Sequence, residues 1–144
     1  MRKKLFLAFI CISFIGLAQE IEHLTDLSEA RKISRTVAGL FQDNKVADAV
    51  DVMKPYWPLP ENEIEAFEEK TMKYLNFYVE KFGLAKSFLK INNQTISDIY
   101  VRETYLVNFS MTSIRLKFTY YKNEDGWIIN SFEWDTEIGE EFQP

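Results

Sequence analysis

Cysteine and histidine are almost missing from this 144-residue sequence. The single cysteine, Cys11, lies inside an apolar run near the N-terminus, and the single histidine is His23. Without that run the chain has no thiol, which excludes disulfide bonds, zinc–cysteine sites and cysteine nucleophiles. Metal binding would then need carboxylates alone, and the scattered Asp and Glu residues show no calcium-loop spacing. We therefore predict no metal, no cofactor and a fold held by its hydrophobic core.

Glycine is also scarce, and basic residues are in the minority. The five glycines form neither a Gly-x-Ser-x-Gly elbow nor a glycine-rich phosphate loop. Lys and Arg number 17 against 22 Asp and Glu, which gives a formal net charge of −5. A negative chain repels the phosphate backbone, so we expect no nucleic-acid partner.

The N-terminus has the pattern of a secretory signal peptide. Residues 2–4 are basic, residues 5–15 form an apolar run, and Gly16 and Ala18 supply the small side chains of a cleavage site. The apolar run is shorter than the roughly 20 residues that a membrane anchor needs. We predict a signal peptide over residues 1–18, a single domain over residues 19–144, and an exported protein, periplasmic or secreted, that leaves the membrane after cleavage.

Apolar residues recur at helical spacing in three segments after the signal peptide. The first helix is expected over residues 27–42, with Asp26 as its N-cap in a capping box. A shorter helix follows and stops at Pro55, and the longest helix lies between Pro60 and Gly83. Each segment has one apolar face, so each helix needs a surface to cover.

Alternating apolar residues after the helices predict an antiparallel meander over residues 96–134. A further strand is expected over residues 87–91, with a turn at residues 92–93, and the tail over residues 137–144 is expected to fray. The predicted class is α+β, with three N-terminal helices packed on one face of a curved antiparallel sheet of about four strands. The inward face of the meander is read from these alternate residues: Ile99, Val101, Tyr105, Val107, Phe109, Ile114, Leu116, Phe118 and Tyr120.

Three stretches look like parts of a known superfamily: FQDNK at residues 41–45, VRETYLV at residues 101–107, and RLKFTYY at residues 115–121 leading into DGWIINSF at residues 125–132. Together they resemble the NTF2-like (cystatin-like) superfamily, in particular small secreted members from Bacteroidetes-type bacteria. The resemblance implies a cone-like pocket between the long helix and the sheet, frequent homodimers, and functions from isomerases and dehydratases to binding and scaffolding modules. No catalytic set carries over, because those enzymes use an Asp or a His/Asp pair, and His23 lies outside the expected core.

Glu103 interrupts the apolar face of the first meander strand. If the alternation holds, its carboxyl points into the interior, where it could act as an acid or a base. Alternatively, a bulge shifts the register, or Glu103 reaches the pocket rim and pairs with a basic side chain. The basic side chains on the opposite face, Arg102, Arg115 and Lys117, are expected to be solvated.

A pocket between the helices and the sheet would have aromatic walls and few charges. Such a site suits a small apolar or ring-shaped ligand held by a few hydroxyls. We interpret the chain as a non-catalytic ligand-binding or accessory module, and the alternatives are an isomerase or lyase that uses Glu103 and a dimeric scaffold with a filled pocket. The residues expected to line the pocket are Tyr56, Trp57, Tyr74, Tyr78, Glu103, Tyr105 and Tyr120.

A homodimer through the sheet is also expected. Alternation places Trp127 and Ile129 on one face of the last strand, and Ile128, Phe132 and Trp134 near the other face. One layer of helices cannot cover both faces, and an exposed apolar patch of that size usually meets a partner.

We predict that the exported protein begins at Gln19. Signal peptidase cleaves after a small residue, which here is Ala18, so the mature protein lacks residues 1–18. The intact mass of the protein recovered from the periplasm or the medium measures this directly. A mass that includes residues 1–18, or a lipid attached to Cys11, would contradict the prediction.

Overall fold

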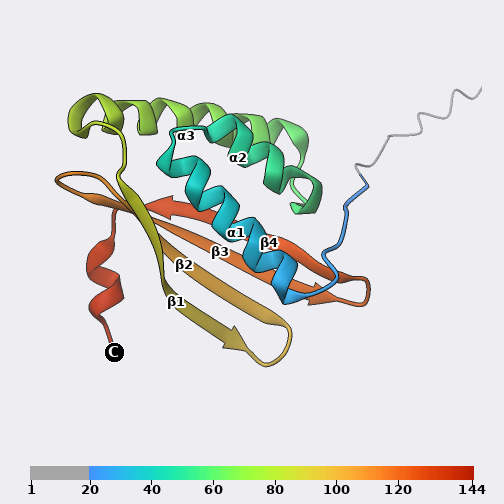
Figure 1. Cartoon of the computed structure of the whole chain (residues 1–144). Coiled ribbons are helices and arrows are strands. Elements are labelled where there is room, and N and C mark those ends of the chain that lie inside the picture. Colours follow the sequence, from blue (N-terminus) through green and yellow to red (C-terminus); the bar gives the residue numbers. More distant parts are fainter. Residues whose placement is uncertain (1–19) are drawn as a thin grey trace, which may run out of the picture.

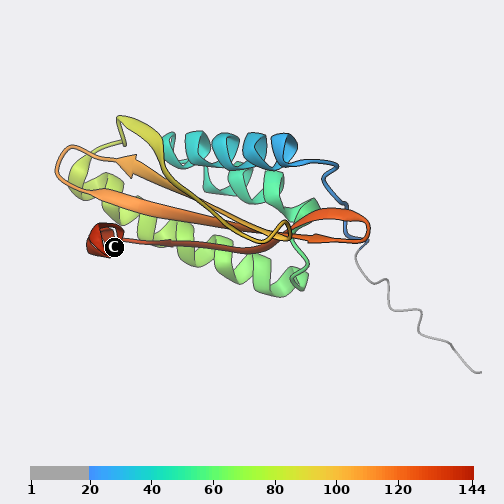
Figure 2. The ribbon, with the colours of Figure 1, turned by 90° about the horizontal axis from the view of Figure 1, so that it is seen from below.

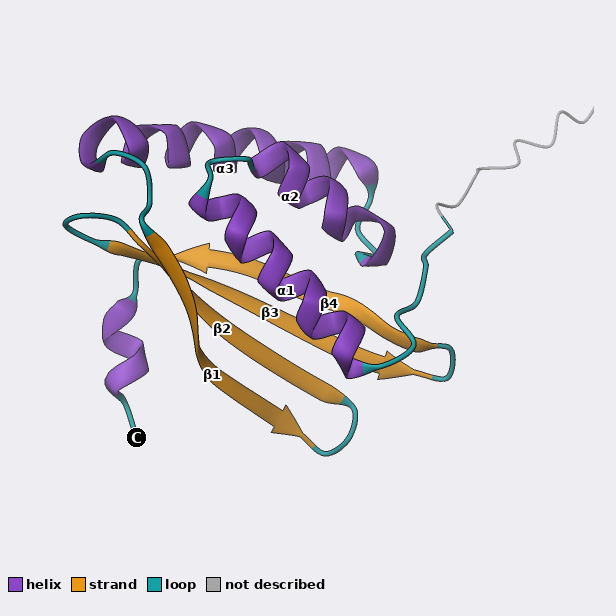
Figure 3. Cartoon of the chain, viewed as in Figure 1, coloured by secondary structure: helices purple, strands orange, loops and turns teal. Residues whose placement is uncertain are grey.

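The computed structural model describes residues 20–144, so the predicted signal peptide, residues 1–18, lies outside the described residues. The four strands pair antiparallel in the order β1-β2-β3-β4, and all three α-helices lie on one face of this sheet (Figure 1, Figure 3). The α+β class and the arrangement of helices over the sheet are therefore as predicted. The elements are α1 (Leu27–Gln42), α2 (Val46–Met53), α3 (Glu61–Phe82), β1 (Ser87–Ile96), β2 (Tyr100–Asn108), β3 (Ser113–Asn123) and β4 (Gly126–Asp135), with short 3-10 turns η1 (Lys54–Tyr56) and η2 (Ile138–Phe142).

The helix ends follow from local chemistry. Asp26 caps α1 by accepting a hydrogen bond from the Glu29 N–H at 2.9 Å, and the Glu29 carboxylate accepts one from the Thr25 N–H at 2.7 Å. α3 ends at Gly83, whose φ of 75° costs glycine little. Seen from below, α1 and α3 run along opposite borders of the sheet (Figure 2).

The alternation predicted for β2 and β3 is confirmed by their register. Val101 lies opposite Tyr120, and Glu103 lies opposite Phe118. All four side chains are buried beneath the helices. Glu103 therefore points into the interior, and no bulge shifts the register between β2 and β3.

The prediction for β1 was too short. This strand continues through Asn92 and Asn93 to Ile96, and the chain turns afterwards at Ser97, whose φ is 47°. β1 is an edge strand whose second half is solvent-exposed, so polar residues can occupy it without a burial penalty. A bulge between Lys90 and Asn92 leaves Lys90 opposite Tyr105, on the helix-covered face.

The predicted facing of side chains in β4 is also corrected, because this strand contains a bulge. Thr119 lies opposite Ser131 and Tyr120 lies opposite Ile129, so Asn130 is an extra residue without a partner across the strands. The extra residue reverses the alternation. Trp127 and Ile129 therefore share the helix-covered face with two further residues, Phe132 and Trp134. The assignment of Phe132 and Trp134 to the other face was wrong, and the homodimer prediction loses that part of its basis.

Phe132 is the centre of the core. Its ring lies 4.8 Å from that of Phe118, 5.6 Å from that of Phe41 and 5.7 Å from that of Phe67, measured between centroids. Trp57 belongs to a proline-rich loop, residues 54–60; its ring lies 6.2 Å from that of Phe132, and the residue is 3% exposed. This aromatic cluster fills the space between the helices and the middle of the sheet, and the proline-rich loop acts as a plug over it.

The segment before α1 is held against the far end of the sheet. Leu24 and Trp127 exchange two main-chain hydrogen bonds, each 2.9 Å long. A side chain at Gly126 would place its Cβ 2.5 Å from the Leu24 carbonyl oxygen, so this approach requires glycine. His23 lies 3.2 Å from the Asn123 amide. His23 is thus outside the core, as expected, but it is fixed by the β3–β4 hairpin.

The C-terminal tail does not fray. Arg115, expected to be solvated, is 2% exposed on the outer face of the sheet. Its guanidinium donates two hydrogen bonds of 2.9 Å to Asp135, one of 2.6 Å to Glu140 and one of 2.6 Å to Glu141. These bonds dock η2 on the face opposite the helices. Burial alone would raise the pKa of Asp135, but the hydrogen bonds from Arg115 outweigh it and hold that pKa below its ordinary value.

We predict that Arg115→Met lowers the free energy of unfolding by about 2 kcal/mol at neutral pH, because it removes the one cation shared by three carboxylates. Since the pKa of Asp135 is lowered, its stabilising effect is present above the ordinary Asp pKa of 3.8 and is lost as the pH falls through the folded value. The difference between wild type and variant should therefore shrink on acidification. Urea unfolding of both proteins, from neutral pH to below pH 3.8, measures this difference in the free energy of unfolding.

Arg102→Met is the matched control, because Arg102 is exposed on the same face and its Nε donates to the neutral Thr119 hydroxyl. An Arg115→Met protein as stable as the Arg102→Met protein would refute the role given to Arg115.

Candidate functional site

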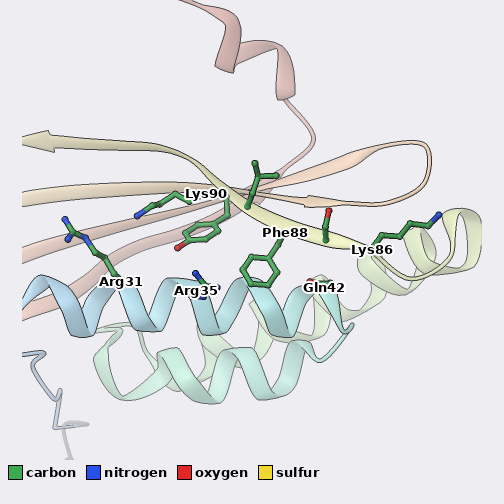
Figure 4. Close-up of a pocket in the computed structure, with 9 residues that line it drawn as sticks. Arg31, Arg35, Gln42, Lys86, Phe88 and Lys90 are labelled. Atoms are coloured by element: carbon green, nitrogen blue, oxygen red, sulfur yellow. The ribbon is translucent and has the colours of Figure 1, made fainter.

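A groove of about 640 Å³ opens between α1 and β1. We call it the α1–β1 groove, and Figure 4 shows its residues. Arg31 and Lys90 lie toward one end, Lys86 and Gln42 toward the other, and the Phe88 ring lies between the helix and the strand (Figure 4). The lining residues are Arg31, Arg35, Gln42, Lys86, Ser87, Phe88, Leu89, Lys90 and Tyr105.

The groove is strongly cationic although the protein is acidic overall. Arg31 and Arg35 lie on successive turns of α1, Lys86 directly precedes β1, and Lys90 lies in the first half of β1. Within residues 20–144, no carboxylate lies within salt-bridge distance of Arg31, Arg35 or Lys86. Four cations around a partly apolar cavity raise the local concentration of anions.

Glu103 lies behind the wall of this groove and does not line it. Its carboxylate is fully buried, with Oε2 3.3 Å from the Lys90 ammonium and 3.4 Å from the Tyr105 hydroxyl, which donates to it. The other oxygen, Oε1, has no hydrogen-bond partner among the described residues. Burial, together with the Glu103 charge, raises the pKa of Tyr105 to about 12, so its hydroxyl keeps its proton at neutral pH.

This geometry suits positioning better than proton transfer. A general acid or base must come within hydrogen-bond reach of its substrate, whereas Lys90 and Tyr105 stand between Glu103 and the groove. Glu103 instead holds the Lys90 ammonium and the Tyr105 hydroxyl at the groove wall. The outcome for Glu103 combines parts of both interpretations: the residue lies in the interior, as uninterrupted alternation predicts, and it pairs with a basic side chain, Lys90.

The other predicted pocket residues do not share one cavity, because only Tyr105 among them lines the α1–β1 groove. Trp57 is buried in the aromatic cluster, and Tyr56 is half-buried against the core. Tyr120 is fully buried, and its hydroxyl donates to the Ala30 carbonyl at 2.9 Å. Tyr74 and Tyr78 line a second groove, of about 650 Å³, between α3 and β4. This α3–β4 groove is lined by Phe67, Lys70, Thr71, Tyr74, Tyr78, Phe132, Glu133, Trp134, Asp135, Thr136 and Glu137.

Sequence reasoning missed the cations of the α1–β1 groove. Arg31 and Arg35 are four residues apart and flank the buried Ser34, so the helical period places them together beside the apolar face. That spacing was a usable signal. Lys90 was harder to place, because the bulge in β1 that follows it leaves no trace in the apolar pattern.

Neither a metal centre nor a membrane span is found in the described part of the chain. Residues 20–144 contain no group of three or more His, Cys, Asp or Glu side chains that could hold a metal ion. None of the helices in that range combines the length and the apolar character needed to cross a membrane.

Comparison with known proteins adds little to this picture. No protein-family model matches the chain. No curated protein matches it either. Among solved structures, the chain is similar to one described as a calcium/calmodulin dependent protein kinase II association domain from Xanthomonas campestris, with 13% sequence identity and a TM-score of 0.42, over 83% of this chain and 96% of that chain. No conclusion about function follows from a likeness of that degree.

We predict that Lys90→Met destabilises the fold by about 2 kcal/mol, because it leaves the buried Glu103 carboxylate without its cation. Glu103→Gln should cost less than about 1 kcal/mol, and the double variant should recover most of the Lys90→Met loss. Urea unfolding of the four proteins completes the cycle. If Lys90→Met is as stable as wild type, the pairing does not organise this wall.

Proposed function

We propose that this protein is a non-catalytic NTF2-like binding module that acts after export, and that the α1–β1 groove holds its ligand. The ligand class follows from the lining of the groove. The cations at its rim favour a carboxylate, sulfonate or phosphate group, and the rings of Phe88 and Tyr105 favour a small apolar or planar body. The sequence alone indicated a small apolar ligand, and the groove cations change this expectation to an organic anion with an apolar body.

One observation carries this proposal, which is the unpaired state of the groove cations. Arg31, Arg35 and Lys86 carry three positive charges without a carboxylate partner among the described residues, in a chain whose net charge is −5. A surface that served solubility alone would disperse such charges among acids. The proposed export increases the contrast between the cationic groove and the acidic chain, because removing residues 2–4 makes the rest of the chain more acidic.

Homodimerisation through the outer face of the sheet also remains a proposal. The bulge in β4 removes Phe132 and Trp134 from that face, but other apolar side chains are still open there. Leu89 is 49% exposed and Ile96 is 69% exposed, and both point away from the helices. A second copy could cover them, although the area is smaller than the sequence indicated.

We predict that benzoate and phenyl phosphate bind the groove, while benzamide, which has the same ring and no charge, binds at least tenfold more weakly. The double variant Arg31→Gln/Arg35→Gln should lose about tenfold in affinity for the anions, since each exposed charge pair contributes up to about 1 kcal/mol. NMR titration of the backbone amides of α1 and β1 measures the affinities.

Lys32→Gln is the matched control, because Lys32 is an exposed cation of α1 that does not line the groove. Affinity should also fall as salt is added. Equal binding of benzoate and benzamide, or equal losses in the control and the double variant, would rule out the α1–β1 groove as an anion site.

We predict a dimer by sedimentation at micromolar concentration, and we expect Ile96→Lys to shift it toward monomer, because a buried lysine at the outer face opposes contact. A wild-type protein that sediments only as a monomer would refute the dimer and leave the groove proposal untouched.

A further inference from the structure

The α3–β4 groove lies at the opposite border of the sheet from the α1–β1 groove and has a different character. Tyr74 and Trp134 form two of its walls, with their ring centroids 6.5 Å apart and their planes at 65°. Tyr74 is half exposed, so part of its side chain is accessible to a ligand. The Trp134 indole is held by a hydrogen bond of 3.1 Å from its Nε1 to the Thr71 hydroxyl. The groove therefore presents an aromatic corner with one wall fixed in place.

One carboxylate and one ammonium group are available at this corner, those of Glu137 and Lys70. Glu133, Asp135 and Glu137 line the groove, against the single Lys70. The carboxylates of Asp135 and Glu133 pair with Arg115 and Lys117 on the outer face of the sheet, away from the aromatic corner. No described residue pairs with the carboxylate of Glu137, which is exposed at the groove. An incoming cation would therefore find one available carboxylate beside two aromatic walls.

We propose that the α3–β4 groove binds a quaternary or methylated ammonium group. The faces of aromatic rings are negative and attract a cation within about 6 Å of the centroid. A methylated ammonium suits such walls better than a bare one, because its methyl groups are apolar and it sheds water readily. In the described chain the only cations that lie over aromatic rings, Lys81 and Lys122, lie over other rings, so Tyr74 and Trp134 have no cation of their own. This site does not depend on the function proposed for the α1–β1 groove.

Choline and its uncharged isostere 3,3-dimethyl-1-butanol are the probes that test this inference. The readout is the indole N–H signal of Trp134, one of the three tryptophans in the chain, assigned by its absence in Trp134→Phe. We expect choline to shift this signal and to bind at least fivefold more tightly than the neutral alcohol. Equal affinities would show that the groove takes an apolar group only, and the absence of a shift at saturating choline would overturn the proposal.

Four variants, one of them a control, locate the site. Tyr74→Leu should weaken choline binding about fivefold, and Phe77→Leu, an exposed aromatic of the same helix that does not line the groove, should leave it unchanged. Glu137→Gln, at an exposed position that does not threaten folding, should weaken it about twofold. Lys70→Gln should strengthen it, because a positive charge leaves the rim. Weaker choline binding in Lys70→Gln, or the same loss in Phe77→Leu as in Tyr74→Leu, would overturn the assignment.

Discussion

The fold depends on the position of one ring, that of Phe132. It is in contact range of rings from α1, the proline-rich loop, α3 and β3, so it joins every layer of the domain. It reaches that position only because Asn130 is an extra residue in β4. With strict alternation, Phe132 and Trp134 would face water and the space under the helices would lack two large aromatic side chains. The bulge residue Asn130 thus determines that Phe132 and Trp134 face the helices.

Aromatic side chains fill the space between the helices and the middle of the sheet, so the large grooves lie at the borders of the sheet. The two large grooves lie where α1 passes β1 and where α3 passes β4, one with unpaired cations and the other with aromatic walls and the carboxylate of Glu137. The two charged residues buried in the sheet follow the same division. Glu103 faces the helices and meets one lysine, and Arg115 faces outward and meets three carboxylates. Each is neutralised by groups that reach it from the edge of the sheet.

How much the sequence predicts depends on whether a pattern is local. α1 has the predicted bounds because its cap and its apolar period lie within the helix itself, and Glu103 lies inward because alternation in β2 is uninterrupted. β4 was misassigned because a single extra residue inverts a period of two. The docking of Glu140 and Glu141 on Arg115, and the approach of Lys90 to α1, join residues far apart in sequence. No periodicity encodes such contacts, so the grooves could not be predicted although most of their residues could be assigned to elements.

The pairing of Leu24 with Trp127 ties the first described residues to the last strand of the sheet. All three helices precede all four strands, so their apolar faces have nothing to cover until the second half of the chain exists. Phe132 and the tail glutamates, which complete the two faces, come last of all. In a chain arranged in this order, the helices cannot bury their apolar faces before the strands have been made. For a protein proposed to cross a membrane before folding, this order of elements delays the burial of the helices until the sheet is present.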